Sequence, residues 1–408
     1  MDSPPGAESA GLAGTEPALI DHAAVDRLRA EPLGWRYKGL PPVAASVEDL
    51  LGRRVPTDGF TSPVATLSGP AMTANLDRYA AFCAGRGLLF APHVKTTMAP
   101  QLAAAQARRG AWAFTVATVA QARVLRAFGA TRILLAHGVV DPAGVEWISR
   151  QQGAAEIFCW VDSVEAVAVL RGRGVPVFVE LGLAGGRTGA RGVTAAAAVA
   201  REVTRTPGVR LAGVAGYEGS YGHDRSDRDV TAVRGHLAEL VRLADIVDAP
   251  IVTAGGSAYP DLVAEALDPA RRRVVLRSGA YVAHDDGFYA GVSPFPMEPA
   301  LRIWATVTST PEPGLAFANF GKRDVSYDLG LPSPIEVLRN GSTHPARRLS
   351  VTQLNDQHAY LSDPDGEVRV GDWVACGISH PCTMFERWGA FAVIDSEQTV
   401  IDVIRTLF

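Results

Sequence analysis

The middle of this 408-residue chain repeats one pattern, in which a short apolar run is followed by an Ala- and Arg-rich stretch with helical spacing. The apolar runs do not alternate with polar residues, which is typical of parallel strands buried on both faces. They lie at residues 87–93, 113–118, 132–137, 157–162, 176–181, 211–216, 250–253 and 273–277. Eight such units predict a (β/α)₈ barrel. A doubly wound open sheet is the second choice, because its glycine fingerprint GxGxxG is absent.

The hydrophobic pattern of the sequence changes after residue 289. Three prolines at 294, 296 and 299 mark a linker, and alternating runs separated by turn-forming residues follow. This pattern predicts an antiparallel β domain. We therefore expect three parts: an N-terminal tail and a segment associated with the β domain (1–58), a cofactor-binding barrel (59–293) and a C-terminal β domain with a metal site (294–408). The first 17 residues, rich in Gly, Pro, Ala and Glu, read as a mobile tail.

Composition excludes several classes of protein. Hydrophobic residues make up 47% of the chain and the formal net charge is −4, which argues against a disordered chain and against a basic nucleic-acid footprint. The N-terminus has neither the basic nor the apolar region of a signal peptide, and no apolar run reaches the roughly 18 residues of a membrane span. Four cysteines form no CxxC pair. We expect a cytoplasmic protein with no nucleic-acid or membrane partner.

Lysine is scarce in this chain, with three residues (Lys38, Lys95 and Lys322) among 39 basic ones. Arginine cannot supply a free amine, because its guanidinium stays protonated. Lys95 follows the first predicted strand and precedes a helix, so we expect it at the mouth of the barrel, where active sites of this fold lie. A partly desolvated lysine there is suited to a Schiff base. The alternative is a surface lysine at the end of a strand.

The last two barrel strands end in small residues. Glycines let the backbone approach a ligand, and barrels often bind phosphate in the loops after strands seven and eight. The residues concerned are Gly255, Gly256 and Ser257 after the seventh strand, and Gly279, Ala280 and Tyr281 after the eighth. Either could be an ordinary turn. Together with Lys95 they indicate a phosphorylated aldehyde cofactor, pyridoxal 5′-phosphate (PLP).

Two other strand ends carry polar groups. Arg187, after the fifth strand, is a candidate to face a ring oxygen of the cofactor or a substrate carboxylate, unless its glycine-rich loop is only surface. Tyr217, after the sixth, is a candidate to stack on a flat ring, unless it is a core residue. Glu218 next to it is a candidate to approach the ring nitrogen. For Glu218, His223 and His137 we favour the plainer interpretation, a solvated or rim side chain.

A second group lies near the C-terminus, where the sequence reads His380-Pro381-Cys382. On an extended segment both side chains would point to one face, since strand side chains alternate with period two. Imidazole and thiolate both bind zinc, but a structural site needs four ligands. Two ligands predict a metal with open positions for water or substrate. The alternative, a pair of side chains packed into the β domain, is favoured by spacing alone.

These motifs together resemble those of one known family. They are Pro92-His93-Val94-Lys95-Thr96, Gly255-Gly256-Ser257, Ser278-Gly279-Ala280-Tyr281 and His380-Pro381-Cys382. The chain is similar, from about residue 61 to its end, to the D-serine dehydratase / D-threonine aldolase family of fold-type III PLP enzymes. It looks most like the bacterial amino acid deaminase branch.

The resemblance implies a barrel of the alanine racemase kind with a C-terminal β domain, usually as a homodimer. It implies that Lys95 forms the Schiff base and that Tyr217, Ser257, Gly279 and Ala280 contact the cofactor. It also implies that His380 and Cys382 bind zinc or another divalent metal.

The function that follows is dehydration of a β-hydroxy-D-amino acid, such as D-serine or D-threonine, to a 2-oxo acid and ammonia. In this scheme Lys95 takes the α-proton and zinc assists loss of the β-hydroxyl. Aldol cleavage to glycine and an aldehyde uses the same parts and is the alternative. A racemase would need a second acid or base opposite Lys95, and none is assignable. A non-catalytic PLP carrier is disfavoured, because such proteins lack a C-terminal β domain.

Overall fold

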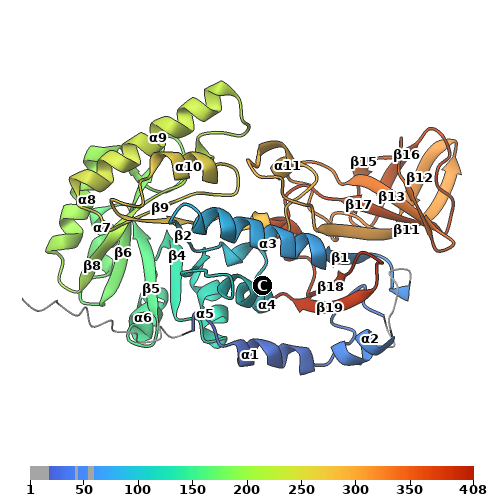
Figure 1. The fold of residues 1–408 in the computed structure, drawn as a ribbon, viewed down its shortest axis with the longest axis horizontal. Coiled ribbons are helices and arrows are strands. Elements are labelled where there is room, and N and C mark those ends of the chain that lie inside the picture. The colour runs from blue at the N-terminus through green and yellow to red at the C-terminus, as the bar shows by residue number, and fades with distance from the viewer. Residues whose placement is uncertain (1–17, 42–44, 54–58) are drawn as a thin grey trace, which may run out of the picture.

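The protein consists of a barrel flanked by helices and a second, separate β-sheet (Figure 1). The computed structural model describes residues 18–41, 45–53 and 59–408. The predicted N-terminal tail, residues 1–17, lies outside the described residues.

Each of the eight predicted apolar runs forms a strand of one parallel sheet. They are β2 (Leu89–Phe90), β3 (Phe114–Val116), β4 (Arg132–Gly138), β5 (Glu156–Val161), β6 (Val175–Gly182), β8 (Val209–Gly216), β9 (Ile251–Ala254) and β10 (Arg273–Leu276). Their order is β2-β10-β9-β8-β6-β5-β4-β3, and the short β7 (Ala190–Arg191) pairs with β6. Backbone bonds from Trp112 N to Phe90 O (2.8 Å) and from Thr115 N to Pro92 O (2.9 Å) join β3 to β2. The predicted barrel is confirmed.

Helices follow the strands, and several of them begin at a residue whose side chain caps the first turn. The side chains of Thr118, Asp141, Ser163 and Ser226 accept a backbone N–H of the first helical turn, as N-caps do. The helices of the barrel are α3 (Gly69–Ala84), α4 (Pro100–Ala107), α5 (Val119–Ala127), α6 (Pro142–Gln151), α7 (Val164–Val169), α8 (Val193–Arg205), α9 (Asp227–Ile246) and α10 (Pro260–Ala266). Among the described helices, none combines the length and apolar character needed to cross a bilayer.

The interior of the barrel is filled unevenly. Large rings fill one side, from Phe158 and Trp160 on β5 and Phe178 on β6. The same cluster contains alanines just after β2 (Ala91), just before β3 (Ala113) and on β8 (Ala212 and Ala215). Because side chains alternate along a strand, the inward-facing residues two positions beyond this layer emerge at the C-terminal mouth. Glu180, two residues after Phe178, is one of them.

The second sheet is the C-terminal β domain that the alternating runs predict. Its strands after the barrel are β11 (Leu301–Glu312), β12 (Gly314–Ala318), β13 (Ser333–Arg339), β14 (Ser342–Pro345), β15 (Ser350–Leu354), β16 (Ala359–Asp363), β17 (Trp373–Gly377), β18 (Ala390–Ile394) and β19 (Val400–Arg405). The main order is β14-β13-β17-β11-β1-β18-β19, with β12, β16 and β15 attached through β11. The pairs among β11–β19 are antiparallel.

The strand β1 (Val64–Ser68) differs from expectation. It falls within the range assigned to the barrel by sequence, yet it lies in the second sheet, antiparallel to β11 and parallel to β18. The physical reason is that an apolar five-residue strand fits the middle of either sheet, and only its long-range partners decide. The helix α3 then leads the chain from the second sheet into the barrel.

The segment before β1 contacts both parts of the molecule. It contains α1 (His22–Asp26), a 3₁₀ turn (Arg27–Ala30) and α2 (Val47–Arg53). On the barrel side, Asp21 N donates to Phe128 O (3.0 Å). On the β-domain side, the buried guanidinium of Arg405 donates to the carbonyls of Leu28 (3.1 Å), Glu31 and Pro32. This one side chain joins the last strand to the first described residues.

We expect Arg405→Ala to lower the free energy of unfolding by about 2–4 kcal/mol, because it leaves buried carbonyls without a donor. Urea unfolding measures the loss. The control is Arg150→Ala on α6, whose exposed pair with Glu146 should contribute no more than about 0.5 kcal/mol. Equal losses in the two variants would contradict the role given to Arg405.

Candidate active site at the mouth of the barrel

Lys95 lies where the sequence predicts, immediately beyond the C-terminal end of β2. It sits in a 3₁₀ turn (Val94–Thr96) whose other two residues are buried, while its own side chain is exposed. The other lysines lie elsewhere: Lys38 Nζ donates to Asp324 Oδ1 (2.8 Å), and Lys322 lies 5.7 Å from the Tyr327 ring centroid. Lys95 is therefore the lysine placed to offer its amine at the barrel mouth.

Gly279 allows β10 to end tightly against the Lys95 turn. A Cβ at this position would lie 2.6 Å from the backbone oxygen of His93 and 2.8 Å from Thr96 Oγ1. Such distances leave no room for a side chain, so this glycine is needed for close approach rather than for an unusual backbone angle. The predicted residues of strands one and eight are thus in contact.

Ser257 connects the ends of β9 and β10. Its Oγ accepts the backbone N–H groups of Gly279 (3.2 Å) and Ala280 (3.1 Å). A hydroxyl that accepts two bonds still has its own proton to donate. The predicted turn residues Ser257, Gly279 and Ala280 therefore do come together, and Gly255, with φ +90°, makes the sharp bend that precedes them.

Glu218 takes a place that the sequence did not predict. It is fully buried, and its carboxylate accepts the N–H groups of Gly255 (2.9 Å) and Gly256 (2.5 Å). From the sequence we expected Glu218 to be solvated, with an approach to the ring nitrogen of the cofactor as the alternative. The structure contradicts solvation: the 3₁₀ turn Glu218–Ser220 directs the carboxylate inward onto the glycine backbone. These two N–H groups are consequently already satisfied by the chain itself.

Tyr281 does not direct its side chain to this group of residues. Its ring stacks on Tyr79 with 4.2 Å between the centroids, and Gln106 Nε2 donates to its hydroxyl (3.0 Å). Burial raises the pKa of this phenol. The side chain packs in the core beneath α3 and α4, because the 3₁₀ turn Ala280–Val282 turns it away from the mouth.

Arginines supply positive charge across the mouth. The guanidinium of Arg187 lies 4.2 Å from the Tyr217 ring centroid, so two predicted residues are stacked on each other. Arg277, which the sequence analysis gave no role, is buried and donates to Thr253 Oγ1 (2.6 Å) and to Gly216 O (2.7 Å). Burial lowers its pKa to about 10, against the attraction of Glu218 and Glu180, so it stays charged at neutral pH.

Two further titratable groups face the mouth. Burial, and then the charges of Lys95, Arg277 and Arg187, hold the pKa of His93 well below its usual range, so its ring is neutral. Its Nδ1 has no hydrogen-bond partner. Burial also raises the pKa of Glu180, although Thr188 and both arginines oppose the shift. Both residues could have been found in the sequence, since each lies two positions from an inward-facing residue.

The His380-Pro381-Cys382 segment is not extended, and this prediction was wrong. His380 has φ +68°, and Cys382 begins a short helix, α12 (Cys382–Phe385). The two side chains still meet through a hydrogen bond. Burial lowers the pKa of His380, but Cys382 and Asp328 outweigh it and raise that pKa to about 9. Cys382 Sγ lies 3.3 Å from Thr96 Oγ1, which places the pair next to the Lys95 turn.

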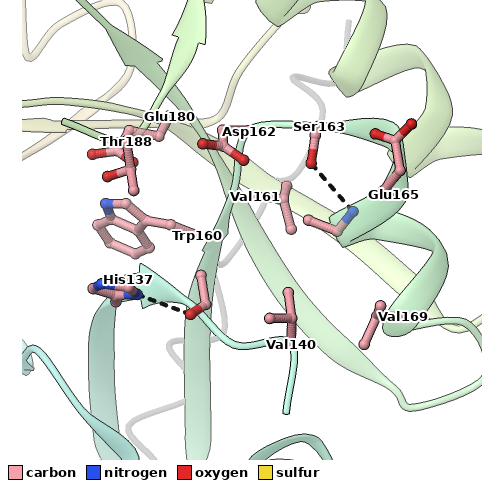
Figure 2. Close-up of a pocket in the computed structure, with 12 residues that line it drawn as sticks. His137, Val140, Trp160, Val161, Asp162, Ser163, Glu165, Val169, Glu180 and Thr188 are labelled. Atoms are coloured by element: carbon pink, nitrogen blue, oxygen red, sulfur yellow. Dashed lines mark hydrogen bonds between the residues drawn. The ribbon is translucent and has the colours of Figure 1, made fainter. Parts of the chain in front are cut away.

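A cavity of about 400 Å³ opens at the ends of β4, β5 and β6 (Figure 2). Half of its polar lining side chains are acidic (Asp162, Glu165 and Glu180), and its apolar lining includes Trp160 and several valines. None of its lining residues is an arginine or a lysine. One of its lining residues is close to Arg277, whose guanidinium lies 5.7 Å from the Trp160 ring centroid.

The two remaining histidines weighed from the sequence stay at the surface. His137 lines the cavity, is exposed, and has its Nδ1 2.9 Å from Gly138 O. His223 is exposed, and its backbone N–H bonds Asp229. The plainer interpretation therefore holds for both side chains.

Two family models match the chain. "Alanine racemase, N-terminal domain" covers residues 68–271, and "Putative serine dehydratase domain" covers residues 300–394. The first spans half of the chain and covers the barrel from α3 through α10, and the second spans most of the C-terminal sheet.

The chain is also similar to individual proteins. A D-threonine aldolase from Arthrobacter sp. is 26% identical over 79% of this chain and 83% of its own. A D-threo-3-hydroxyaspartate dehydratase from Delftia sp. (strain HT23) is 26% identical over 75% of this chain and 84% of its own. The crystal structure of D-threonine aldolase from Filomicrobium marinum superposes with a TM-score of 0.76 at 21% identity, covering 86% of this chain and 96% of that one.

We expect Gly279→Ala to weaken binding of PLP by about tenfold or more, because the added methyl group would push the Lys95 turn away from Ser257 at a cost of about 1–3 kcal/mol. Titration of the apo-protein followed by visible absorbance measures the dissociation constant. In the control, Gly235→Ala on α9, the added Cβ meets nothing within 4 Å. Unchanged affinity in Gly279→Ala would show that the close approach is not needed.

Proposed function

Because the chain belongs to the PLP-dependent family that joins an alanine racemase N-terminal domain to a serine dehydratase domain, we propose that it is a lyase that dehydrates β-hydroxy-D-amino acids. The products are a 2-oxo acid and ammonia, and D-serine or D-threonine is the expected substrate. The observation that carries the proposal is the 3.3 Å contact between Thr96 Oγ1 and Cys382 Sγ. It places the His380–Cys382 pair beside the lysine turn.

The residues present fit PLP. Lys95 offers the amine that binds the aldehyde, and the Ser257 hydroxyl has a proton to donate to the phosphate. Buried Nε of Arg277 and Nδ1 of His93 lack partners at the mouth, which indicates room for a polar ligand. Arg187 and Tyr217 supply a charged and a flat surface. When bound, PLP withdraws electrons from the α-carbon of the substrate.

Lys95 is the residue we expect to move the α-proton. Once the amino group of the substrate has replaced it, its Nζ is free to accept the proton from the α-carbon. The neutral His93 two residues before it adds no positive charge next to that amine. The cations around the mouth outnumber the buried acids, which suits the negative charges of a phosphate and a substrate carboxylate.

His380 and Cys382 fit a metal that also contacts substrate. Within the part of the chain that the structure describes, no group of three or more His, Cys, Asp or Glu side chains is arranged to hold a metal ion. A two-ligand site leaves the other positions to water or substrate, unlike a closed structural zinc site. Zinc held there would act as a Lewis acid on the β-hydroxyl.

Aldol cleavage remains the second candidate, because one of the similar proteins is named a D-threonine aldolase. We favour dehydration because the motif resembles that of the deaminase branch and carries a cysteine rather than an acidic residue. The solved structures of the similar dehydratase include a histidine-to-alanine variant and, two positions further on, a cysteine-to-alanine variant in the metal-free form. That spacing is the spacing of His380 and Cys382. A PLP carrier would have no use for such a pair.

A second copy of the chain is the expected partner. Tyr327, Leu329 and Leu331 are 40–45% exposed in the loop that also carries Asp328, next to His380. Burial of this apolar patch would favour a homodimer that covers the mouth of the site. Sedimentation at equilibrium tests the assembly.

We expect the holo-protein to convert D-serine to pyruvate and ammonia, and Lys95→Ala to lack both this activity and the visible absorption band of bound cofactor. Separate assays for 2-oxo acid, ammonia, glycine and aldehyde, with D- and L-isomers of serine and threonine, measure the reaction. Chelation of the metal should lower turnover. Glycine with aldehyde as the main products would establish the aldolase instead, and activity in Lys95→Ala would refute the role of the lysine.

A further inference from the structure

We propose that Asp328 is the positioning residue of the metal pair: it fixes the His380 ring so that Nε2 is the nitrogen offered to the metal, and it is not itself a ligand. The inference rests on the metal site of the proposed function. It concerns a residue that lies far from the motif in sequence, in the loop between β12 and β13.

The backbone of His380 is held in an uncommon conformation. Its φ of +68° lies in the left-handed region, which residues other than glycine adopt rarely and at a cost of about 1 kcal/mol or more. The N–H of His380 donates to Asp285 Oδ2 (2.8 Å). The other oxygen of this buried carboxylate accepts the N–H groups of Gly287, Tyr289 and Ala290. Asp285 is therefore held in place by both of its oxygens, and it fixes the backbone of His380.

The ring of His380 is fixed by Asp328. His380 Nδ1 lies 2.5 Å from Asp328 Oδ2, and the other oxygen, Oδ1, accepts the hydroxyl proton of Thr383 (2.7 Å). A neutral imidazole that donates from Nδ1 to a carboxylate has its lone pair on Nε2, so Nε2 is then the nitrogen that can bind a metal. Both carboxylate oxygens are engaged, so Asp328 would have to break one of these bonds to reach a metal.

The loop that carries Asp328 is attached to the His380 segment on both sides. Ser326 Oγ donates to Ser379 O (2.6 Å), and Ser379 Oγ donates to Leu329 O (2.8 Å). Asp328 lies between these two attachments, one residue from Leu329. These two hydrogen bonds hold the backbone on both sides of Asp328, whereas an incidental ion pair at the surface usually has no such flanking bonds.

The hydrogen-bond chain also couples the two ligand residues. Thr383 directly follows Cys382, so Asp328 contacts the histidine by one oxygen and the neighbour of the cysteine by the other. Loss of the carboxylate charge would free the ring to rotate and would lower the basicity of Nε2. Partners of metal-bound histidines typically contribute 10–100-fold in metal affinity.

The test measures zinc binding by the PLP-loaded protein through competition with a chromogenic chelator. We expect Asp328→Asn to weaken zinc binding about 10–100-fold, with unchanged cofactor absorbance and unfolding midpoint. Thr383→Val, which removes only the support of the carboxylate, should weaken it less. Cys382→Ala shows how much zinc affinity is lost when a direct ligand is removed. The matched control is Asp356→Asn, an exposed acid that pairs with Arg323 at 3.5 Å and should have no effect.

The outcomes separate the possibilities. Affinity equal to wild type in Asp328→Asn overturns the proposal, and a loss as large as that in Cys382→Ala overturns it in favour of a direct ligand. Cobalt substitution adds a readout independent of activity: a positioning role leaves the thiolate-to-cobalt absorption band in place in Asp328→Asn. A wild-type protein that converts D-serine but binds no zinc would refute the metal role and this inference while leaving the lyase activity standing. A protein that binds zinc as expected but converts no D-amino acid would refute the proposed function alone.

Discussion

The turn that carries Lys95 is the constraint around which the rest of the site is arranged. It is held on one side by β3, since Thr115 N donates to Pro92 O (2.9 Å). On the other side β10 closes against it, because Gly279 has no Cβ to meet the His93 carbonyl. From the β domain, Cys382 Sγ contacts Thr96 Oγ1 at 3.3 Å. The flexible side chain of Lys95 therefore extends from a backbone turn that both the barrel and the β domain hold in place.

This arrangement explains why the two parts of the molecule are interlocked. The strand β1 lies in the second sheet, and α3 then returns the chain to β2, directly before the lysine turn. Arg405 on the last strand holds the segment that precedes α2. The His380–Cys382 pair belongs to the β domain and the Lys95 amine to the barrel, and they keep a fixed separation only if the two parts do not hinge freely. The crossings of the chain and this buried guanidinium oppose such a hinge.

The sequence predicted the barrel well because the signal is local. Each buried parallel strand is a continuous apolar run, and the residues just after it, such as Lys95 and Ser257, must face the mouth. It failed where long-range contacts decide. Nothing near β1 distinguishes the two sheets, and the inward turn of Glu218 depends on N–H groups 37 and 38 residues away. The His-x-Cys pair meets through a left-handed histidine and a helical turn, which period-two reasoning cannot anticipate.

The motifs that place this chain in its family cannot by themselves determine its reaction. Similar proteins are named aldolase and dehydratase, and the lysine, the glycine-rich turns and the His-x-Cys pair serve either outcome. What distinguishes one member from another must then lie in residues outside the motifs. In this protein one such residue is Asp328, which we propose positions the His380 ring. The choice between breaking the C–O bond and breaking the Cα–Cβ bond depends on whether the β-hydroxyl leaves or loses its proton. We therefore expect the orientation of the His380–Cys382 pair toward that oxygen to be a more direct determinant than Lys95, whose amine would bind the cofactor aldehyde in either reaction.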